Sequence, residues 1–160
     1  MSREAAARSL QVEVLRRCRS GAPGARQIAT WAGAALGRRA RGGELAVRMV
    51  GPRESRALNA RYRGHDHATN VLSFGVHAPA WPKGSSRAPL GDLVICPRIV
   101  REEARLQRKT LRAHWAHLIV HGTLHLIGYD HEQPGQARRM ERREIAVLKR
   151  LGFANPYRST

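Results

Sequence analysis

The chain has 160 residues, of which 29 are lysine or arginine and 12 are aspartate or glutamate, so its formal net charge is +17. A chain of this length is most simply one domain, residues 1–160, that buries a core of its own. Its two cysteines, Cys18 and Cys96, are too few for a disulfide framework and fit a reducing cytoplasm. No apolar run approaches the roughly 18 residues of a membrane span, and the N-terminal region lacks the apolar segment of a signal peptide. We therefore expect a soluble, cytoplasmic protein without a membrane partner.

The positive charge indicates a polyanionic partner, with nucleic acid as the first candidate and an anionic membrane surface as the second. Codon usage is an alternative explanation. Only Lys83, Lys109 and Lys149 are lysines, and the other basic residues are arginines in a chain rich in alanine and glycine. A GC-rich genome can produce that composition without selection for binding, so charge alone leaves both explanations open.

Apolar periodicity divides the chain into strands and helices. In chain order the sequence predicts a strand at 10–15, a helix at 25–36, a strand at 44–50, a helix at 52–61, strands at 70–76 and 90–96, and helices at 97–106, 110–127 and 134–151. Basic, polar or proline-rich loops are expected at 38–43, 62–69 and 77–89. The continuous apolar stretch from Leu93 to Cys96 indicates a strand that is buried on both faces.

Four strands and about five helices, mostly segregated along the chain, predict an α+β fold. Strands that are separated by helices can run parallel, whereas the last two strands are expected to form an antiparallel hairpin. The sheet should therefore be mixed.

The most informative stretch is the end of the penultimate helix. Thr110 can cap this helix at its start, and Gly128 follows where a helix usually stops. His121 and His125 are four residues apart, so both imidazoles leave the same helix face. The chain can then turn and bring His131 back as a third ligand. Three protein ligands with an open fourth position are typical of a catalytic zinc site, so we expect one zinc ion here.

The same His-x3-His-x5-His spacing, with glycine seven residues after the first histidine, is used by metzincin proteases. Those enzymes carry a glutamate directly after the first histidine as general base, and this chain has Gly122 there. The metal geometry is therefore present without the peptidase base. Asp130 could orient an imidazole, cap the turn or act as a base, and orientation is favoured because ligating histidines usually have a hydrogen-bonded partner. A metal-activated water is the other candidate for the base.

A second pair of histidines offers an alternative ligand set. His114 and His117 lie on the same helix, and His117 is itself four residues before His121, so these two could be the ligand pair instead. We favour His121 with His125 because that pair is nearer the glycine turn and His131. We interpret His114 and His117 as hydrogen-bonded to backbone or to carboxylates.

The stretch from His114 to His131, HWAHLIVHGTLHLIGYDH, resembles the signature of the bacterial YbeY family of metal-dependent endoribonucleases. Further blocks match, namely LNARYRG at 58–64, NVLSF at 70–74, LGDLVIC at 90–96 and the ending LGFANPY at 151–157. The resemblance covers most of the chain from about Glu44 onward, and the three-histidine block is its most specific part. It implies a zincin-like fold in which the metal helix packs against the sheet.

The family's Tyr-Arg-Gly motif matches Tyr62 to Gly64, so the resemblance implies that Arg63 is a catalytic residue together with His121. A guanidinium suits a phosphodiester because it can donate two parallel hydrogen bonds and hold charge that develops on the phosphate oxygens. A solvated surface charge is the alternative for any one arginine in a chain so rich in them.

The chain departs from the family around this motif. His65 and Ala68 stand where lysine and proline are common, and Gly75 stands where proline is usual. His65 and His67 could keep partial positive charge, contact RNA, or have drifted without a function. These departures leave the catalytic residues intact. Asp92 is expected to brace the metal helix or its histidines and not to act in catalysis.

The resemblance implies a zinc-dependent, single-strand-specific endoribonuclease that holds one zinc ion through His121, His125 and His131. It further implies a role in maturing the 3′ end of the small-subunit (16S) ribosomal RNA and in ribosome quality control. Its partners would be ribosomal RNA and small-subunit components. The sequence leaves open whether water or the ribose 2′-hydroxyl attacks. Two other classes remain, a ribosome-assembly or RNA-binding factor with a structural metal and, less favoured, a zinc peptidase.

Overall fold

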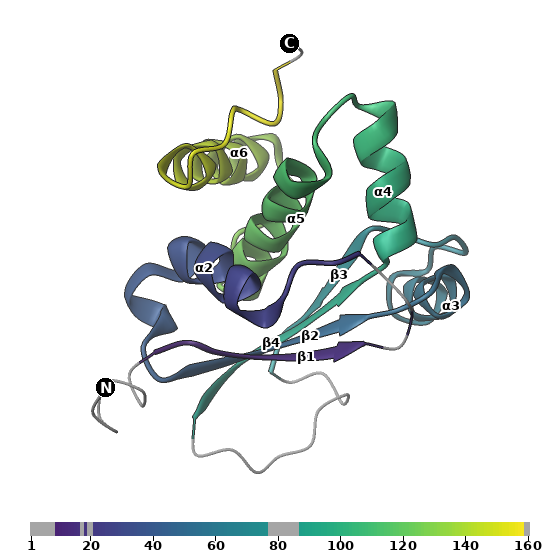
Figure 1. The fold of residues 1–160 in the computed structure, drawn as a ribbon, viewed down its shortest axis with the longest axis horizontal. Coiled ribbons are helices and arrows are strands. Elements are labelled where there is room, and N and C mark those ends of the chain that lie inside the picture. Colours follow the sequence, from purple (N-terminus) through teal and green to yellow (C-terminus); the bar gives the residue numbers. More distant parts are fainter. Residues whose placement is uncertain (1–8, 17, 19–20, 77–86, 159–160) are drawn as a thin grey trace.

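The computed structural model describes residues 9–16, 18, 21–76 and 87–158 (Figure 1). The loop expected at 77–89 lies largely outside this part of the chain. The elements are, in order, β1 (Gln11–Arg16), α2 (Ala25–Leu36), η1 (Gly37–Ala40), β2 (Gly43–Met49), α3 (Pro52–Arg63), β3 (Val71–Phe74), β4 (Ala88–Ile95), α4 (Pro97–Leu106), α5 (Leu111–Leu126) and α6 (Pro134–Arg150). In the described part of the chain, no helix is both long and apolar enough to cross a membrane.

The four strands form one mixed sheet in the order β1-β2-β4-β3. β1 and β2 run parallel, β2 and β4 run parallel, and β3 pairs antiparallel with β4. The α+β class, the mixed sheet and the antiparallel pairing of the last two strands are therefore confirmed. β4 lies between β2 and β3, which places the short strand β3 at the edge of the sheet.

The two faces of the sheet carry different layers. Helices α2, α5 and α6 lie over one face (Figure 1), where they share a core with side chains that alternate along the strands, including Leu45, Val47, Leu93 and Ile95. The intervening residues form a second cluster with α3 that contains Leu58, Tyr62, Leu72, Phe74 and Val94. Residues 93–96 are all buried, which confirms the prediction that the last strand is covered on both faces.

The predicted element boundaries lie within two residues of the observed ones, and the differences have local causes. Helix α3 continues to Arg63, two residues beyond its predicted end, and stops where Gly64 adopts a left-handed φ of 73°. Gly37–Ala40 forms a short 3₁₀ helix where α2 ends and the basic loop was expected to begin. β4 begins at Ala88, because its first residues still pair with β2 at Gly43 and Glu44.

Candidate metal centre

Helix α5 is held in place by a capped first turn and by a buried face. The Thr110 hydroxyl accepts a hydrogen bond from the backbone N–H of Ala113 at 3.1 Å, so Thr110 caps the helix as predicted. Trp115, Ile119 and Leu124 are buried in the main core. This packing fixes the helix, and with it the histidines, relative to the sheet.

Gly122, directly after the first of the three histidines, lies against the sheet. A Cβ atom at this position would stand 2.9 Å from a Leu93 methyl carbon, 3.2 Å from a Val71 methyl carbon and 3.3 Å from the Ser73 hydroxyl. The Ser73 hydroxyl also donates a hydrogen bond to the Gly122 carbonyl at 3.0 Å. At the position that holds the glutamate base in metzincins, a side chain could therefore be accommodated here only if Leu93, Val71 or Ser73 shifted.

The end of α5 turns the chain so that His131 returns toward the helix. Gly128 has a φ of 101°, and the two backbone N–H groups that follow Ile127 bond back to carbonyls of the last helical turn at 3.1 Å each. This is the hydrogen-bond pattern of a glycine-terminated helix. The Asp130 carboxylate accepts a hydrogen bond from the backbone N–H of His131 at 2.7 Å, which caps the turn. The same oxygen lies 4.0 Å from Nδ1 of the His131 ring, and the favoured role, orientation of an imidazole, stays a prediction.

The structure brings His121, His125 and His131 together. One ligand atom from each lies within 4.8 Å of the other two. Their ring centroids are 4.7 Å apart for the first pair, 4.9 Å for His125 and His131, and 5.8 Å for His121 and His131. Zinc–nitrogen bonds measure about 2.0–2.1 Å, so small ring movements would bring all three nitrogens to one ion.

The protonation of His125 suits a metal ligand. Its burial, reinforced by the neighbouring His121 and His131, lowers the pKa of His125 to about 4. The imidazole is therefore neutral at physiological pH and carries the free lone pair that metal binding requires. On the basis of this donor set and its spacing, the three histidines fit a zinc ion.

A buried carboxylate, Glu144 of α6, lies directly behind this group. One of its oxygens accepts a hydrogen bond from Nδ1 of His121, and the other accepts one from the Tyr157 hydroxyl and lies 3.3 Å from Nε2 of His117. Burial alone raises the pKa of Glu144, but hydrogen bonds from His117, His121 and Tyr157 outweigh it and lower the pKa to about 2. Glu144 is therefore ionised, although it is fully buried.

Sequence reasoning missed Glu144, although the chain contains a signal for it. The residue stands four positions after Met140 and four before Leu148, both of which are buried, so a charge occupies the inward stripe of α6. A charged residue in such a stripe needs a partner. The partner itself could not be identified, because the histidines that contact Glu144 are 27 and 23 residues away along the chain.

Among the residues that the structure describes, two overlapping groups of side chains could hold an ion. One consists of His121, His125 and His131, and the other of His117, His121 and Glu144. In the second group the ring nitrogens face the carboxylate as hydrogen-bond partners. The first group offers three imidazoles that converge at the turn, and this arrangement favours it as the ligand set.

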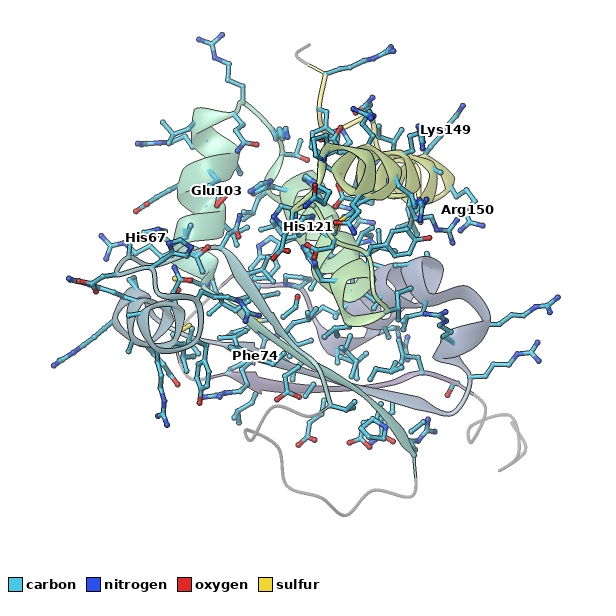
Figure 2. All side chains as sticks on the ribbon, turned by 180° about the vertical axis from the view of Figure 1, so that it is seen from behind. His67, Phe74, Glu103, His121, Lys149 and Arg150 are labelled. Carbon is cyan, nitrogen blue, oxygen red and sulfur yellow. The ribbon has the colours of Figure 1, made fainter. Side chains whose placement is uncertain are left out.

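The remaining histidine of α5 is also paired with a carboxylate. Nε2 of His114 lies 3.1 Å from the carboxylate of Glu103 on α4, which also accepts a hydrogen bond from the Asn70 amide at 3.0 Å. Figure 2 shows Glu103 on α4 and His121 on α5. An open groove of about 1030 Å³ is lined by residues that include Glu103, His114, His117 and His121. These contacts agree with the interpretation that His114 and His117 are hydrogen-bonded to carboxylates.

Arg63 is the last residue of α3 and reaches the edge strand β3. Its guanidinium donates a hydrogen bond to the Ser73 carbonyl at 2.7 Å and lies 5.4 Å from the centre of the Phe74 ring. The side chain of the same Ser73 bonds to the carbonyl of Gly122, next to His121. Arg63 therefore approaches the histidine helix from across β3, with Ser73 between them.

Other residues that the sequence singled out do not join the histidines. His65 and His67 are exposed in the loop after α3, with ring centroids 5.8 Å apart. Asp92 precedes Leu93, whose side chain faces Gly122 of α5. Because neighbouring residues of a strand point to opposite faces, Asp92 faces away from α5, and the expectation that it braces the metal helix is wrong.

The sequence matches a protein-family model described as Endoribonuclease YbeY over residues 24–152. The chain is 50% identical to a protein named Endoribonuclease YbeY from Stenotrophomonas maltophilia and 51% identical to one of the same name from Xanthomonas axonopodis. Each alignment spans 140 residues, which is 87% of this chain and 87% of the relative. The solution structure of TM1509 from Thermotoga maritima, 22% identical, covers 92% of this chain and 99% of its own with a TM-score of 0.53, which shows a shared fold. The family match spans most of the chain and includes the three histidines, Arg63 and Glu144, so the chain belongs to the YbeY endoribonuclease family.

Proposed function

We propose that this protein is an endoribonuclease that cleaves single-stranded RNA with one zinc ion held by His121, His125 and His131. The convergence of these three imidazoles at the end of α5 is the observation that carries the proposal. Membership of a family whose relatives are named endoribonucleases supports the reaction class. The formal net charge of +17 supports a polyanionic substrate.

The metal ion and the histidines that would hold it have distinct proposed roles. When bound, zinc polarises a phosphate oxygen or lowers the pKa of a water molecule. His125 binds without first losing a proton, because its pKa lies well below neutral. The side chain of His131 is 60% exposed, so the group opens toward solvent and toward a substrate. A structural zinc site is usually closed by four protein ligands, and this exposure favours the catalytic kind.

The contacts of Arg63 support its proposed role in holding the phosphodiester. One terminal nitrogen of the Arg63 guanidinium donates a hydrogen bond to the Ser73 carbonyl, and this bond orients the guanidinium. A guanidinium has five N–H donors, so most of them remain for phosphate oxygens. Charge that develops on those oxygens during cleavage is stabilised by donors that are already in place. Arg63 and His121 are therefore the proposed catalytic residues.

The peptidase alternative is disfavoured by the packing of α5. A metzincin base would have to occupy the position of Gly122, where a Cβ atom alone would stand 2.9 Å from Leu93. Asp130 is the nearest acidic residue in the sequence, and its carboxylate is engaged by the backbone of the turn. The ligand spacing is therefore shared with peptidases without the residue that their mechanism needs.

The proposal extends to the cellular role that the family resemblance implies. It assigns the protein to maturation of the 3′ end of 16S ribosomal RNA and to ribosome quality control in the cytoplasm, with small-subunit components as partners. It also treats residues 1–160 as a single domain. Support comes from the family match and from the basic composition.

Metal analysis combined with a cleavage assay tests the proposal. Wild type and the triple variant His121→Ala, His125→Ala, His131→Ala are compared for zinc content and for single-turnover cleavage of labelled single-stranded and duplex RNA. We expect one zinc per wild-type chain, preference for the single strand, and loss of both zinc and cleavage in the triple variant. His117→Ala should keep most of its zinc. A cyclic phosphate on the product would identify the ribose 2′-hydroxyl as the nucleophile.

Three outcomes would contradict the proposal. Zinc-loaded wild type that binds RNA without cutting it would favour an assembly factor with a structural metal. Full cleavage by the metal-free triple variant would mean that the activity comes from elsewhere. Loss of zinc from His117→Ala would show that the other histidine pair holds the ion.

A further inference from the structure

The buried carboxylate of Glu144 connects three separate parts of the chain. It belongs to α6, it accepts a hydrogen bond from His121 and lies within hydrogen-bond distance of His117, both on α5, and it accepts another bond from Tyr157 in the C-terminal segment. Burying a carboxylate is costly unless donors surround it. Neither the catalytic residues nor the metal ligands include Glu144, so this arrangement needs an explanation of its own.

The first step concerns the two ring nitrogens of His121. A neutral imidazole carries a proton on one nitrogen and a lone pair on the other. Nδ1 of His121 faces one oxygen of the Glu144 carboxyl group, and the Tyr157 hydroxyl donates to the other oxygen, so the group is positioned to accept a hydrogen bond from Nδ1. The proton therefore sits on Nδ1, and the lone pair is on Nε2, which is the nitrogen left for a metal ion.

The second step concerns the other carboxylate oxygen. It accepts a hydrogen bond from the Tyr157 hydroxyl and lies 3.3 Å from Nε2 of His117. Tyr157 is itself held in place, because the Lys109 ammonium donates to the preceding Pro156 carbonyl at 2.6 Å. With both oxygens occupied, Glu144 can neither rotate freely nor turn toward an ion.

We propose that Glu144, braced by Tyr157, is a positioning residue that fixes the tautomer and the ring orientation of His121 and thereby sets the affinity of the metal centre. The group formed by His117, His121 and Glu144 is then a hydrogen-bonded bracket and not a second metal site. The C-terminal segment is part of the metal centre through Tyr157. This inference rests on the proposed zinc site and adds to it the residues that prepare one ligand.

The chain offers a matched control for this idea. Glu103 is a second carboxylate that faces a histidine of α5, since it lies 3.1 Å from Nε2 of His114. His114 is not among the proposed ligands, so the pair has the same chemistry without a link to the ion. Glu144→Gln and Glu103→Gln each remove one carboxylate charge beside α5, and only the first alters the partner of a ligand.

Zinc affinity, measured by competition with a chelator on the full chain, is the first readout. Loss of a carboxylate partner of a ligating histidine typically weakens metal binding 10- to 100-fold, and we expect about this loss in Glu144→Gln. Tyr157→Phe removes one hydrogen bond to the carboxylate and should weaken binding several-fold. Glu103→Gln should bind zinc as wild type does. Equal affinities in all four proteins would overturn the proposal.

The second readout is the histidine tautomer, from nitrogen NMR of the metal-free proteins. We expect the proton of His121 on Nδ1 in wild type and a mixture of the two tautomers in Glu144→Gln. A proton on Nε2 of His121 in wild type would contradict the proposal that Glu144 fixes the tautomer of this ring. Two zinc ions per chain would also overturn it, because Glu144 would then be a ligand.

The two readouts separate this inference from the proposed function. If wild type binds no zinc, the proposed metal site fails, while the NMR measurement still reports whether Glu144 sets the tautomer. If Glu144→Gln does not fold, Tyr157→Phe carries the test. The Tyr157 side chain is partly exposed, and this substitution removes only its hydroxyl group and keeps the Glu144 carboxylate. Unchanged affinity and tautomer in that variant would remove Tyr157 from the bracket.

Discussion

Arg63 and Arg61 lie two residues apart on α3 and make one similar contact. The Arg63 guanidinium lies 5.4 Å from the Phe74 ring centre, and that of Arg61 lies 5.3 Å from the Tyr62 ring centre. Only Arg63 also bonds to the Ser73 carbonyl beside the histidine helix. A comparison of the two therefore separates a surface arginine on an aromatic ring from one that is oriented toward the metal centre.

We predict that Arg63→Ala lowers single-turnover RNA cleavage by about 100- to 1000-fold, because a preorganised donor to the transition state is lost. The loss of one exposed hydrogen bond and one cation–π contact should lower the free energy of unfolding by about 1–2 kcal/mol. Zinc content should stay at the wild-type level. Arg63→Lys should recover little activity, because an ammonium cannot make the two-pronged contact. Cleavage as slow in Arg61→Ala as in Arg63→Ala would remove Arg63 from the active site.

Asp92 gives a prediction about pH. Its burial in β4 raises the pKa of Asp92 from its usual 3.8 to about 6, although nearby Arg48 opposes the shift. The folded state therefore holds this proton more tightly than the unfolded state, and the contribution of Asp92 to stability falls as pH rises from about 4 to about 6. Asp92→Asn removes that penalty. Relative to wild type, the variant should gain about 1–2 kcal/mol between these pH values.

Urea denaturation of both proteins across this pH range measures the difference directly. Histidines and the other carboxylates titrate in both proteins, so the difference between variant and wild type isolates Asp92. Because Asp92 faces away from α5, zinc content should be the same in both. A difference in stability that does not change with pH would show that Asp92 is ionised throughout this range.

Helix α5 could be predicted because residues at both of its ends signal locally where the helix starts and stops. Thr110 supplies the cap that the structure shows, and Gly128 supplies the left-handed residue at the turn. These signals act over a few residues, so sequence alone contains them. They also place His121 and His125 on one face of the helix, so the sequence alone identifies these two residues as candidate ligands.

The docking of α6 could not be predicted in the same way. Its proline start and apolar stripe mark it as a helix. The contact of Glu144 with two histidines of α5 depends on how two helices pack, across 23 and 27 residues of chain. The position of β4 between β2 and β3 likewise depends on long-range strand pairing, because the sequence pattern of each strand is compatible with several neighbours. Local periodicity carries no information about either.

Replacement by alanine is predicted to have opposite effects at two helical glycines, Gly122 of α5 and Gly33 of α2. In Gly122→Ala the new Cβ atom would meet Leu93 at 2.9 Å, in a core that is already filled, so we expect a destabilisation of about 1–3 kcal/mol. In Gly33→Ala, within α2, the new atom meets nothing within 4 Å. Removing a helical glycine there should stabilise the protein by about 0.5–1 kcal/mol.

Chemical denaturation of both variants tests this pair, because propensity alone would make both substitutions stabilising. A gain in stability for Gly122→Ala would show that α5 can move off the sheet. The variant should also bind zinc less tightly if the histidines depend on the position of the helix. An unchanged zinc affinity in a destabilised Gly122→Ala would separate helix packing from ligand geometry.

The positive charge of the protein exceeds what pairing with its own acidic residues can neutralise. The chain has 29 lysines and arginines for 12 aspartates and glutamates. Some acids are already paired with arginines, as in Arg48 with Glu54 and Arg56 with Asp66, and Glu144 is buried beside two histidines. Most of the arginines are therefore available to contact solvent or a polyanion, whether RNA binding or codon usage explains the composition.

Salt dependence decides between RNA binding and codon usage as the reason for this excess. Each phosphate contacted on a single strand should contribute a slope of about −0.7 to the logarithm of the binding constant against the logarithm of salt concentration. Five contacts would give a slope of about −3.5, and affinity would fall steeply between low and physiological salt. The triple histidine variant, measured by titration with labelled RNA, keeps the charge while preventing cleavage. Arg63→Ala in that background should change the slope by no more than about 0.7, because it removes one contact among several. A binding constant that is indifferent to salt would mean that the arginines do not meet phosphates and that genome composition explains them.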